Sequence, residues 1–552
     1  MTGWAHPAWP CLAGAVLSAV LPAAGRRAVA LAAPAVALGL AWLLPDGARV
    51  EGVLAGLPLV CLRSDALGRV FAIVFALLGG LALCYGFHGS RRLHVAGLTA
   101  TAAGLGIVLA GDWITLYASW ETLAVASFVL ITDGGTSRAS GAALRYLLVH
   151  AVGGSLFLAG VVVHLASGGD PGVGPLDGRG AETLVLLGFL VNAAVVPLHA
   201  WLPDAYPESS PAGSVFLSAF ATKAAVYALI RTFAGTEGLV WAGVSMALYG
   251  VVFAVLENDV RRLLAYHIVS QVGYMVVGVG LGSPLALAGA AAHAFCHILY
   301  KGLLFMAAGA VVESTGHRRL TDLGGLGAPL RSILVLYMVG ALSISGAPLL
   351  SGFVSKAMIV SAAEEAGRTG VALLLGLASV GTFLSVGLKL PLFAFGGSPR
   401  NLPTRKVPLA AQVAMVVTAA LCGLYGLAPE LLYRLLPQGF SYAPYTAEHI
   451  VTVLQVLAGT AVGFALVEPR LRAKAMVTLD FDRAYRAAGR WVAQGLGPAV
   501  ARGAENLEAV VLDLAARTMA QVRGPAARPV GYAVLLVVVT LGLGLTLFGK
   551  SR

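Results

Sequence analysis

Residues 113–132 read WITLYASWETLAVASFVLIT, a stretch in which one carboxylate is surrounded by apolar and small side chains. About 20 such residues, in helical form, cross the ~30 Å hydrocarbon layer of a membrane. In lipid, every backbone N–H and C=O must find its partner within its own helix or within a closed barrel. The stretch does not alternate with a period of two, and neither does VLLVVVTLGLGLTLFG at residues 534–549. These runs therefore predict membrane-spanning helices and exclude a transmembrane barrel.

The whole chain has the composition of a membrane protein. Of its 552 residues, 58% are apolar and 11% charged, against roughly 25% charged residues in soluble domains. The net charge of +11 comes from short connections between apolar runs, such as those with Arg91, Arg92, Arg318 and Arg319. Such loops are typical of the cytoplasmic side and of anionic lipid headgroups rather than of nucleic-acid binding. The five cysteines are far apart without CxxC spacing, which indicates reduced structural side chains.

Apolar windows recur along the chain and predict about 14 to 16 membrane spans. The fold class is therefore an all-α polytopic bundle. Residues 8–25 are expected to be the first span, because no lysine or arginine precedes Arg26 and a signal peptide needs a basic start.

Two windows contain prolines next to charged or titratable residues. PLHAWLPDA places Pro197 and Pro203 around His199, and GLKLPLFAFGG places Pro391 two residues after Lys389. Proline removes a helix hydrogen bond, and irregular backbone at membrane depth persists only inside protein or beside a water-filled cavity. We expect two broken helices next to an ion site.

The C-terminal part differs in composition. Between Met476 and Gly524 the charge density rises, while Leu507, Val510 and Leu514 recur at helical spacing. This pattern predicts an amphipathic surface helix at 471–528, followed by a last span. An ordinary solvated extension is the alternative.

Glu121 and Lys223 are ionisable residues inside apolar runs. Placing an ionised carboxylate at mid-bilayer costs at least about 2.5–3.5 kcal/mol, and such residues are functional by default. A lysine that gains and loses an acidic neighbour can take up and release a proton. The alternatives are a structural ion pair for Glu121 and, for Lys223, an ammonium group that reaches the membrane interface.

The run HAFCHILYK gives the sharpest local pattern. His293, His297 and Lys301 are each four residues apart, so they lie on one face about 6 Å apart along the helix. Histidine titrates near neutral pH, and the stripe is a candidate proton wire. A zinc site with Cys296 or a haem ligand is the less favoured alternative.

Two further lysines are candidates of unequal strength. Lys389, before Pro391, places a cation at the second expected helix break. Lys356, in LLSGFVSKAMIV, is ambiguous and is also compatible with a position near an interface. No pattern for a nucleotide, flavin or iron–sulfur cofactor occurs, so no cofactor is predicted.

Longer motifs resemble a known family. The carriers are SWETLAVASFVLI (119–131), PLHAWLPDAYPESSPAGSVFLSAFATKAAVYALIR (197–231), ENDVRRLLAYHIVSQVGYM (257–275), HAFCHILYKGLLFMAAGAVVESTGHRRLTDLGGL (293–326) and SISGAPLLSGFVSK (343–356). They are similar to the antiporter-like subunits shared by Mrp-type multisubunit Na⁺/H⁺ antiporters, respiratory complex I and membrane-bound hydrogenases. The version with His267 most resembles the Mrp D subunit.

The resemblance implies two inverted five-helix repeats, each with a broken helix, and a hydrated polar axis. The expected axis residues are Glu121, Lys223, His293, His297, Lys301 and Lys389. The expected divisions are N-terminal helices at 1–90, a first repeat at 91–235, a second repeat at 236–400, C-terminal helices at 401–470, the amphipathic segment at 471–528 and a last helix at 529–552.

One position departs from the family pattern. Asn192, in GFLVNAAVVPLHAWLP, stands where the family usually has the lysine that partners the glutamate matching Glu121. Asparagine donates and accepts hydrogen bonds but does not titrate. Either Lys223 alone serves Glu121, or the first repeat does not transport.

Three functions follow as hypotheses. The leading one is a proton-translocating subunit of a multisubunit cation (Na⁺)/H⁺ antiporter in a prokaryotic cell membrane, with other membrane subunits as partners. The second is a pumping subunit of a complex I-like or hydrogenase-like redox complex. The third is a structural subunit whose ion path is inactive, as the asparagine at position 192 suggests.

Overall fold

The computed structural model describes residues 4–54, 56–176 and 180–471, and beyond them only positions 480, 481, 483 and 487. Internal contacts divide the chain into two units, residues 1–50 with 62–478, and residues 51–61 with 479–552. The first unit contains the α-helices from Ala8 to Leu471. The predicted amphipathic segment lies almost entirely, and the last span entirely, outside the described residues.

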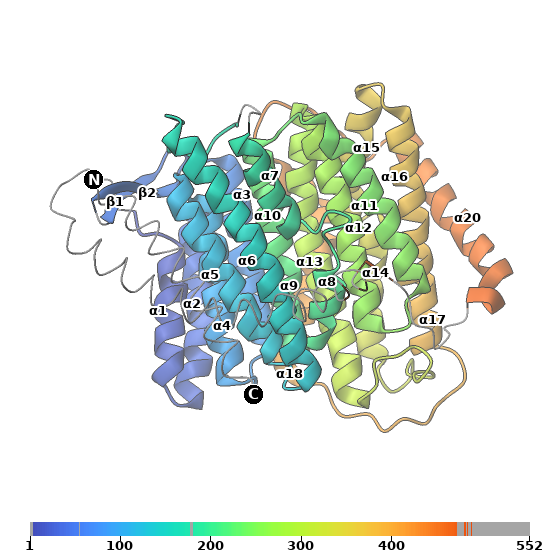
Figure 1. The fold of residues 1–552 in the computed structure, drawn as a ribbon. Coiled ribbons are helices and arrows are strands. Elements are labelled where there is room, and N and C mark those ends of the chain that lie inside the picture. The colour runs from blue at the N-terminus through green and yellow to red at the C-terminus, as the bar shows by residue number, and fades with distance from the viewer. Residues whose placement is uncertain are drawn as a thin grey trace. The chain divides into compact units, whose positions relative to one another are not determined.

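The described part is nearly all helical, which confirms the predicted all-α polytopic class. The α-helices are α1 (Ala8–Val20), α2 (Ala23–Leu43), α3 (Ala66–Tyr85), α4 (Arg91–Leu109), α5 (Trp113–Thr132), α6 (Ser137–Ala166), α7 (Ala181–Asn192), α8 (Trp201–Ala205), α9 (Pro211–Ala219), α10 (Ala221–Thr232), α11 (Glu237–Leu256), α12 (Val260–Leu281), α13 (Pro284–Thr315), α14 (Arg331–Ser345), α15 (Ser351–Glu365), α16 (Thr369–Thr382), α17 (Leu390–Ala394), α18 (Leu409–Leu427), α19 (Glu430–Tyr433) and α20 (Ala447–Leu471). Figure 1 shows the helices of this unit packed side by side.

Shorter elements complete the described chain. A 3₁₀ turn, η1 (Tyr206–Glu208), follows α8, and a π-helical segment, η2 (Phe383–Lys389), joins α16 to α17. Two strands that the sequence did not predict, β1 (Arg49–Leu54) and β2 (Leu57–Arg63), pair into one small sheet.

Within the described residues, 12 helical segments are long and apolar enough to cross a membrane. Three shorter apolar helices, α1, α7 and α14, accompany them. The first predicted span, residues 8–25, corresponds to α1, one of these three shorter helices, which begins at Ala8. The full number of spans stays a prediction, since the C-terminal part of the chain is not described.

The first expected helix break is present. The helix α7 ends at Asn192, and helical structure resumes only at Trp201 in the short α8. Between them the chain passes through His199, whose side chain is fully buried and lies against the ring of Tyr249. The break is enclosed only in part: Asn192 and His199 are buried, whereas Pro197 is exposed.

The second expected break was placed at the wrong helix. The chain stays helical through Lys389 and Pro391, because α16, η2 and α17 follow one another without a gap. A π-helical turn before the proline accommodates its missing N–H donor without breaking the helix.

The discontinuous helix of this half is formed by α14 and α15 instead. Together they run along α13 in order of depth: Gly340 lies against Leu304, Ser355 against His293, and Gly289 against Ile359. The two helices are therefore halves of one crossing, interrupted at residues 346–350. Gly346 adopts a left-handed conformation (φ 78°) that ends α14 without the strain of a β-carbon.

The most enclosed segments are α9 with α10 (Pro211–Thr232), α12 and α13, whose apolar windows are 100%, 100% and 94% buried. Helix α13 contacts α3, α9, α12, α14, α15 and α18. This central position puts the HAFCHILYK stripe inside protein rather than at the lipid surface. The division into two repeats stays a prediction.

Candidate ion path

Three buried lysines share one kind of hydrogen bond. The ammonium of each donates to the carbonyl oxygen of the penultimate residue of a helix. The pairs are Lys223 with Ser218 of α9 (2.6 Å), Lys356 with Ile344 of α14 (2.7 Å) and Lys389 with Val255 of α11 (2.6 Å). Lys389 also donates to the carbonyl of Glu257 (2.8 Å).

Helix geometry explains this pattern. The last carbonyls of a helix have no partner within it, and the helix dipole places partial negative charge there. A buried ammonium both satisfies such a carbonyl and is stabilised by it. The ends of α9, α14 and α11 therefore each provide a carbonyl that binds a buried ammonium.

Local backbone features position two of these lysines. Lys223 lies in α10, directly after the interruption at Phe220 that separates α9 from α10. Lys389 is the last residue of the π-helical segment η2. In both cases the departure from α-helical geometry lies within one turn of the lysine.

Lys301 differs from the other lysines. It is fully buried in α13, and among the described residues its ammonium has no hydrogen-bond partner. The ring of Phe305 lies 5.8 Å away. Both ring nitrogens of the buried His297 are likewise without a partner among the described residues. Buried polar groups normally have partners, often ordered water, so hydration is expected here.

His293 is the best connected member of the stripe. Its Nδ1 lies 3.0 Å from the hydroxyl of Ser355 on α15, and its Nε2 lies 3.4 Å from the hydroxyl of Tyr300. The rings of His293 and His297 have centroids 6.2 Å apart. All three stripe residues of HAFCHILYK are buried in α13, and the proton wire through them stays a prediction.

The buried bases form one group, which we call the basic cluster. Its members interact electrostatically with one another and come from α10, α12, α13 and α15; they are Lys223, His267, His293, His297, Lys301 and Lys356. All are described residues, and none of the described carboxylates belongs to the group. Like charges within such a group repel one another.

Glu121 stands apart from the basic cluster. Its side chain is half-buried on α5, and the buried carboxylate oxygen Oε1 has no hydrogen-bond partner among the described residues. The carboxylate lies so close to α6 that a β-carbon at Gly154 would be 2.0 Å from Oε1. Among the described residues no ion pair joins Glu121 to Lys223. The structure therefore does not bring these two predicted partners together.

Lys389 lies beside a carboxylate that sequence reasoning missed as a site residue. Glu257, at the end of α11, interacts with it electrostatically and forms an ion pair with Arg262 (3.3 Å). In the sequence, this glutamate lies within ENDVRR, between two predicted helices. Nothing in that motif distinguishes a site carboxylate from an ordinary loop carboxylate.

Asn192 occupies the end of α7 beside the first break. It is buried, and its side-chain oxygen has no partner among the described residues. Gln271 on α12 is also fully buried with both amide atoms unpartnered among the described residues. Neutral amides are common in apolar helices, so sequence reasoning gave no reason to select Gln271.

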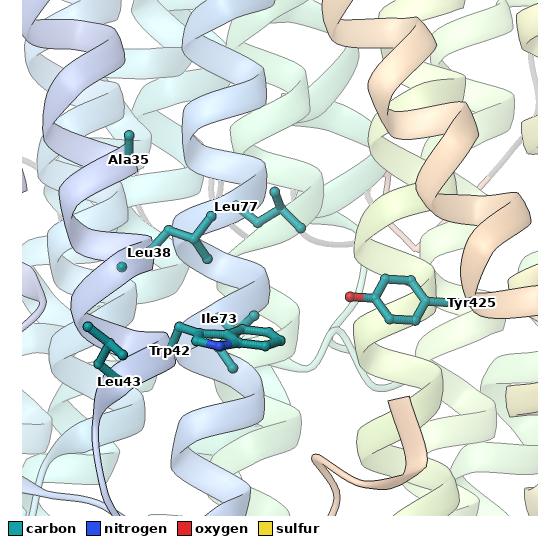
Figure 2. A pocket seen from close by; sticks show the side chains of 8 residues that line it. Ala35, Leu38, Trp42, Leu43, Ile73, Leu77 and Tyr425 are labelled. Atoms are coloured by element: carbon teal, nitrogen blue, oxygen red, sulfur yellow. The ribbon is translucent and has the colours of Figure 1, made fainter. Parts of the chain in front are cut away.

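An apolar cavity of about 580 Å³ lies away from these residues. Figure 2 shows Leu38 and Trp42 of α2 and Ile73 of α3 on one side and Tyr425 of α18 on the other. Its lining is almost entirely apolar and matches lipid acyl chains better than ions. It therefore has no part in the candidate path.

The sequence matches a family model over residues 110–385, described as NADH:quinone oxidoreductase/Mrp antiporter, TM. The D subunit of the Na⁺/H⁺ antiporter of Alkalihalophilus pseudofirmus is 33% identical over 305 residues, which cover 51% of this chain and 61% of that protein. The chain thus spans about three fifths of the length of that relative. The N subunit of the NADH-quinone oxidoreductase of Desulforudis audaxviator is 32% identical, with 53% of this chain and 67% of that protein covered.

A comparison with a solved structure supports the same family through the fold. A chain of the Mrp complex from Dietzia sp. superposes with a TM-score of 0.69 at 26% identity, covering 84% of this chain and 98% of that chain. The resemblance inferred from the sequence motifs is confirmed. The chain belongs to the NADH:quinone oxidoreductase/Mrp antiporter family of transmembrane subunits.

Proposed function

We propose that this chain is the D-type subunit of a multisubunit Na⁺/H⁺ antiporter and moves protons through its basic cluster. The observation that carries the proposal is the set of buried lysines whose ammonium groups bind carbonyls at helix ends. The partners are other membrane subunits, and the location is a prokaryotic cell membrane. The similarity to the Na⁺/H⁺ antiporter of Alkalihalophilus pseudofirmus supports sodium as the exchanged cation.

The mechanism follows from the electrostatics of the basic cluster. Two unit charges 4 Å apart repel by about 4 kcal/mol at an effective dielectric constant of 20. A proton that arrives at one base therefore favours release from another. Lys301, whose ammonium has no carbonyl acceptor among the described residues, is the site from which a proton leaves most easily.

The two ends of the path have different surroundings. Lys389 is held by two carbonyls and lies near Glu257. Glu121 is half-buried, with its carboxylate against Gly154 of α6, and in the assembled complex we expect a partner subunit to provide a cation for it. An unpaired carboxylate at membrane depth costs at least about 2.5–3.5 kcal/mol.

Loop charges give the orientation. Arg91 and Arg92 at the start of α4, with Arg318 and Arg319 in the loop after α13, lie on one face of the membrane, which the positive-inside rule assigns to the cytoplasm. The connection between α15 and α16 lies on the opposite face, because α14 and α15 cross the membrane from the loop that holds Arg318.

Two substitutions test the proposal. Glu121→Gln and Lys389→Ala should each abolish proton exchange in membrane vesicles while the complex still assembles. Matched controls are Glu237→Gln, in an exposed ion pair with Arg368, and Lys406→Ala, in an exposed loop. Exchange at the native rate in both Glu121→Gln and Lys389→Ala would contradict the proposed path.

A redox-driven complex is the second candidate, because the N subunit of an NADH-quinone oxidoreductase is also among the relatives. The helices of this chain do not distinguish an antiporter from a redox-driven pump, since either complex needs the same proton path. The subunit composition of the native complex does distinguish them, because only a redox-driven complex contains flavin and iron–sulfur subunits.

A further inference from the structure

The apolar cavity of about 580 Å³ lies on a side of the bundle that faces lipid. Helices α2 and α18 both pack against α3. Figure 2 shows Trp42 of α2 on one side of the cavity, Tyr425 of α18 on the other, and Ile73 and Leu77 of α3 between them. The membrane-spanning windows of α2 and α18 are only 28% and 39% buried, so the walls of the cavity belong to helices that border the membrane.

The cavity extends through one leaflet of the membrane. It begins near the ends of α2 and α18, where Trp42 and Tyr425 lie close to the last helical residues. Leu77, its innermost lining residue on α3, lies about three helical turns after the helix starts at Ala66, which is about 16 Å, or half the hydrocarbon layer. A spanning helix of another subunit would need a groove through both leaflets. An acyl chain needs one.

The mouth of the cavity lies on the face opposite the arginine-rich loops. Helix α3 ends at Tyr85, and α4 begins at the same face with Arg91, so the start of α3 lies on the other face. Cys84, near the end of α3, has its Sγ 3.5 Å from the carbonyl of Ala410 at the start of α18. Helix α18 therefore runs antiparallel to α3 and ends where α3 begins.

A charged pair lies beside this mouth. Arg69 precedes Ile73 by about one turn of α3, so the two residues share a face of the helix. Its Nη1 lies 3.0 Å from Oδ1 of Asp46 and donates to the carbonyl of Leu44, directly after α2 (3.3 Å). A guanidinium has five N–H donors, and within the described residues those on Nε and Nη2 have no acceptor. The Asp46 side chain is 59% exposed.

We propose that this cavity binds one molecule of phosphatidylethanolamine in the leaflet opposite the arginine-rich loops. One acyl chain fills the cavity along Ile73 and Leu77. The phosphate accepts hydrogen bonds from the remaining N–H donors of Arg69, as arginine and phosphate groups commonly pair. The primary ammonium of the headgroup lies against the carboxylate of Asp46. A zwitterionic headgroup thus matches both members of the pair, whereas an anionic headgroup matches Arg69 alone.

Photo-cross-linking tests the site in the assembled complex. Vesicles that hold the complex receive a small fraction of phosphatidylethanolamine with a diazirine in the middle of one acyl chain, or phosphatidylglycerol with the same chain. After irradiation, mass spectrometry identifies the labelled peptides. Phosphatidylethanolamine should label residues 35–43 and 73–77 about three- to fivefold more than phosphatidylglycerol does, the range expected from one partly exposed ion pair. Equal labelling by the two lipids, or no label in these segments, would overturn the proposal.

Filling the cavity tests where the acyl chain lies. Gly39 lines the cavity, and a β-carbon there would meet no atom within 4 Å. Gly39→Trp should therefore occupy the space of the chain and remove the preferential labelling. Gly459→Trp is the matched control, because Gly459 is exposed on α20 and its β-carbon would likewise meet nothing. Preferential labelling that persists in Gly39→Trp would contradict the site, and Gly39→Leu serves the same test should the tryptophan prevent assembly.

Two charge substitutions test the headgroup contacts. Arg69→Gln should lower labelling by both lipids, because both carry a phosphate. Asp46→Asn should lower labelling by phosphatidylethanolamine only and so abolish the difference between the lipids. Arg368→Gln, in an exposed ion pair with Glu237 on the same membrane face, is the control and should change neither. An undiminished preference for phosphatidylethanolamine in Asp46→Asn would overturn the assigned headgroup.

Discussion

At the level of single residues, the partner of each buried charge decides its chemistry. Lys223, Lys356 and Lys389 each have a carbonyl acceptor, whereas the Lys301 ammonium has none among the described residues. The four buried lysines therefore differ in the hydrogen-bond acceptors of their ammonium groups.

Asn192 is the residue at which transport by the first repeat can be tested. A lysine there would add a cation at the end of α7, where helix-end carbonyls favour it. We expect Asn192→Lys to change the rate of proton exchange severalfold, measured in vesicles with quantified amounts of assembled complex. Asn192→Gln is the neutral control. An unchanged rate in Asn192→Lys would favour the structural-subunit hypothesis.

Sequence reasoning located these residues better than it located their contacts. The spacing of HAFCHILYK was sufficient to predict a stripe on one helix, because helical periodicity fixes which side chains share a face. The acceptors Ser218, Ile344 and Val255 are ordinary residues, and their importance arises only from being next to a helix end. No local sequence pattern shows that a backbone carbonyl lacks a hydrogen-bond partner within its helix.

At the level of elements, helix ends and caps position the path. Asp65 caps α3 by accepting from the N–H of Gly68 (2.8 Å), and it also forms an ion pair with Arg231 of α10 (2.5 Å). One side chain thus fixes the start of α3 against the helix that carries Lys223. Burial opposes the charge of Asp65, but Arg231 and the N–H of Gly68 hold its pKa below the usual value.

Substitution of Asp65 separates the cap from the ion pair. Asp65→Ala should destabilise the protein by about 0.5–2 kcal/mol through loss of the cap. Asp65→Asn keeps a capping oxygen and should cost less than about 1 kcal/mol, because the carboxylate is partly exposed and solvent screens the pair. Thermal unfolding in detergent measures both changes, and equal destabilisation by the two variants would contradict the role of the cap.

The same measurement has a pH dependence with a defined sign. Since the folded-state pKa of Asp65 is below 3.8, the ion pair contributes its full stability well above that pH. The contribution falls as the pH drops through 3.8 toward the folded-state value. Asp65→Asn should lack this part of the pH dependence.

The break in the second half shows what sequence reasoning could not place. Pro391 was a reasonable indicator, since proline usually ends or kinks a helix. The π-helical segment absorbs it, while the run SGAPLL between α14 and α15 produces the discontinuity. A proline in the sequence shows only that one backbone N–H donor is absent. Whether the helix ends there depends on the helices packed around it.

At the level of the whole molecule, composition and apolar runs were sufficient to predict a polytopic bundle, and the longer motifs to predict its family. They could not predict the enclosure of α13 or the apolar cavity beside α18, because both depend on how distant helices pack. The half-buried position of Glu121 against α6 likewise depends on how the helices pack.

The composition of the native complex separates the two candidate machines. Under the antiporter proposal, the complex purified through this chain should contain membrane subunits only and show no flavin or iron–sulfur absorbance between about 350 and 500 nm. A complex of the redox type would show both bands and lose them on reduction. The presence of these bands would favour the pumping-arm alternative.

The penultimate carbonyls have a consequence for how such a protein changes during evolution. A single base change can replace a lysine or restore it, but the acceptor exists only where a helix ends, and that depends on several residues at once. A lysine moved by one turn would meet backbone carbonyls already engaged within the helix. These positions for a buried cation are therefore inherited with the ends of the helices, and the side chains that occupy them are the part that can be exchanged.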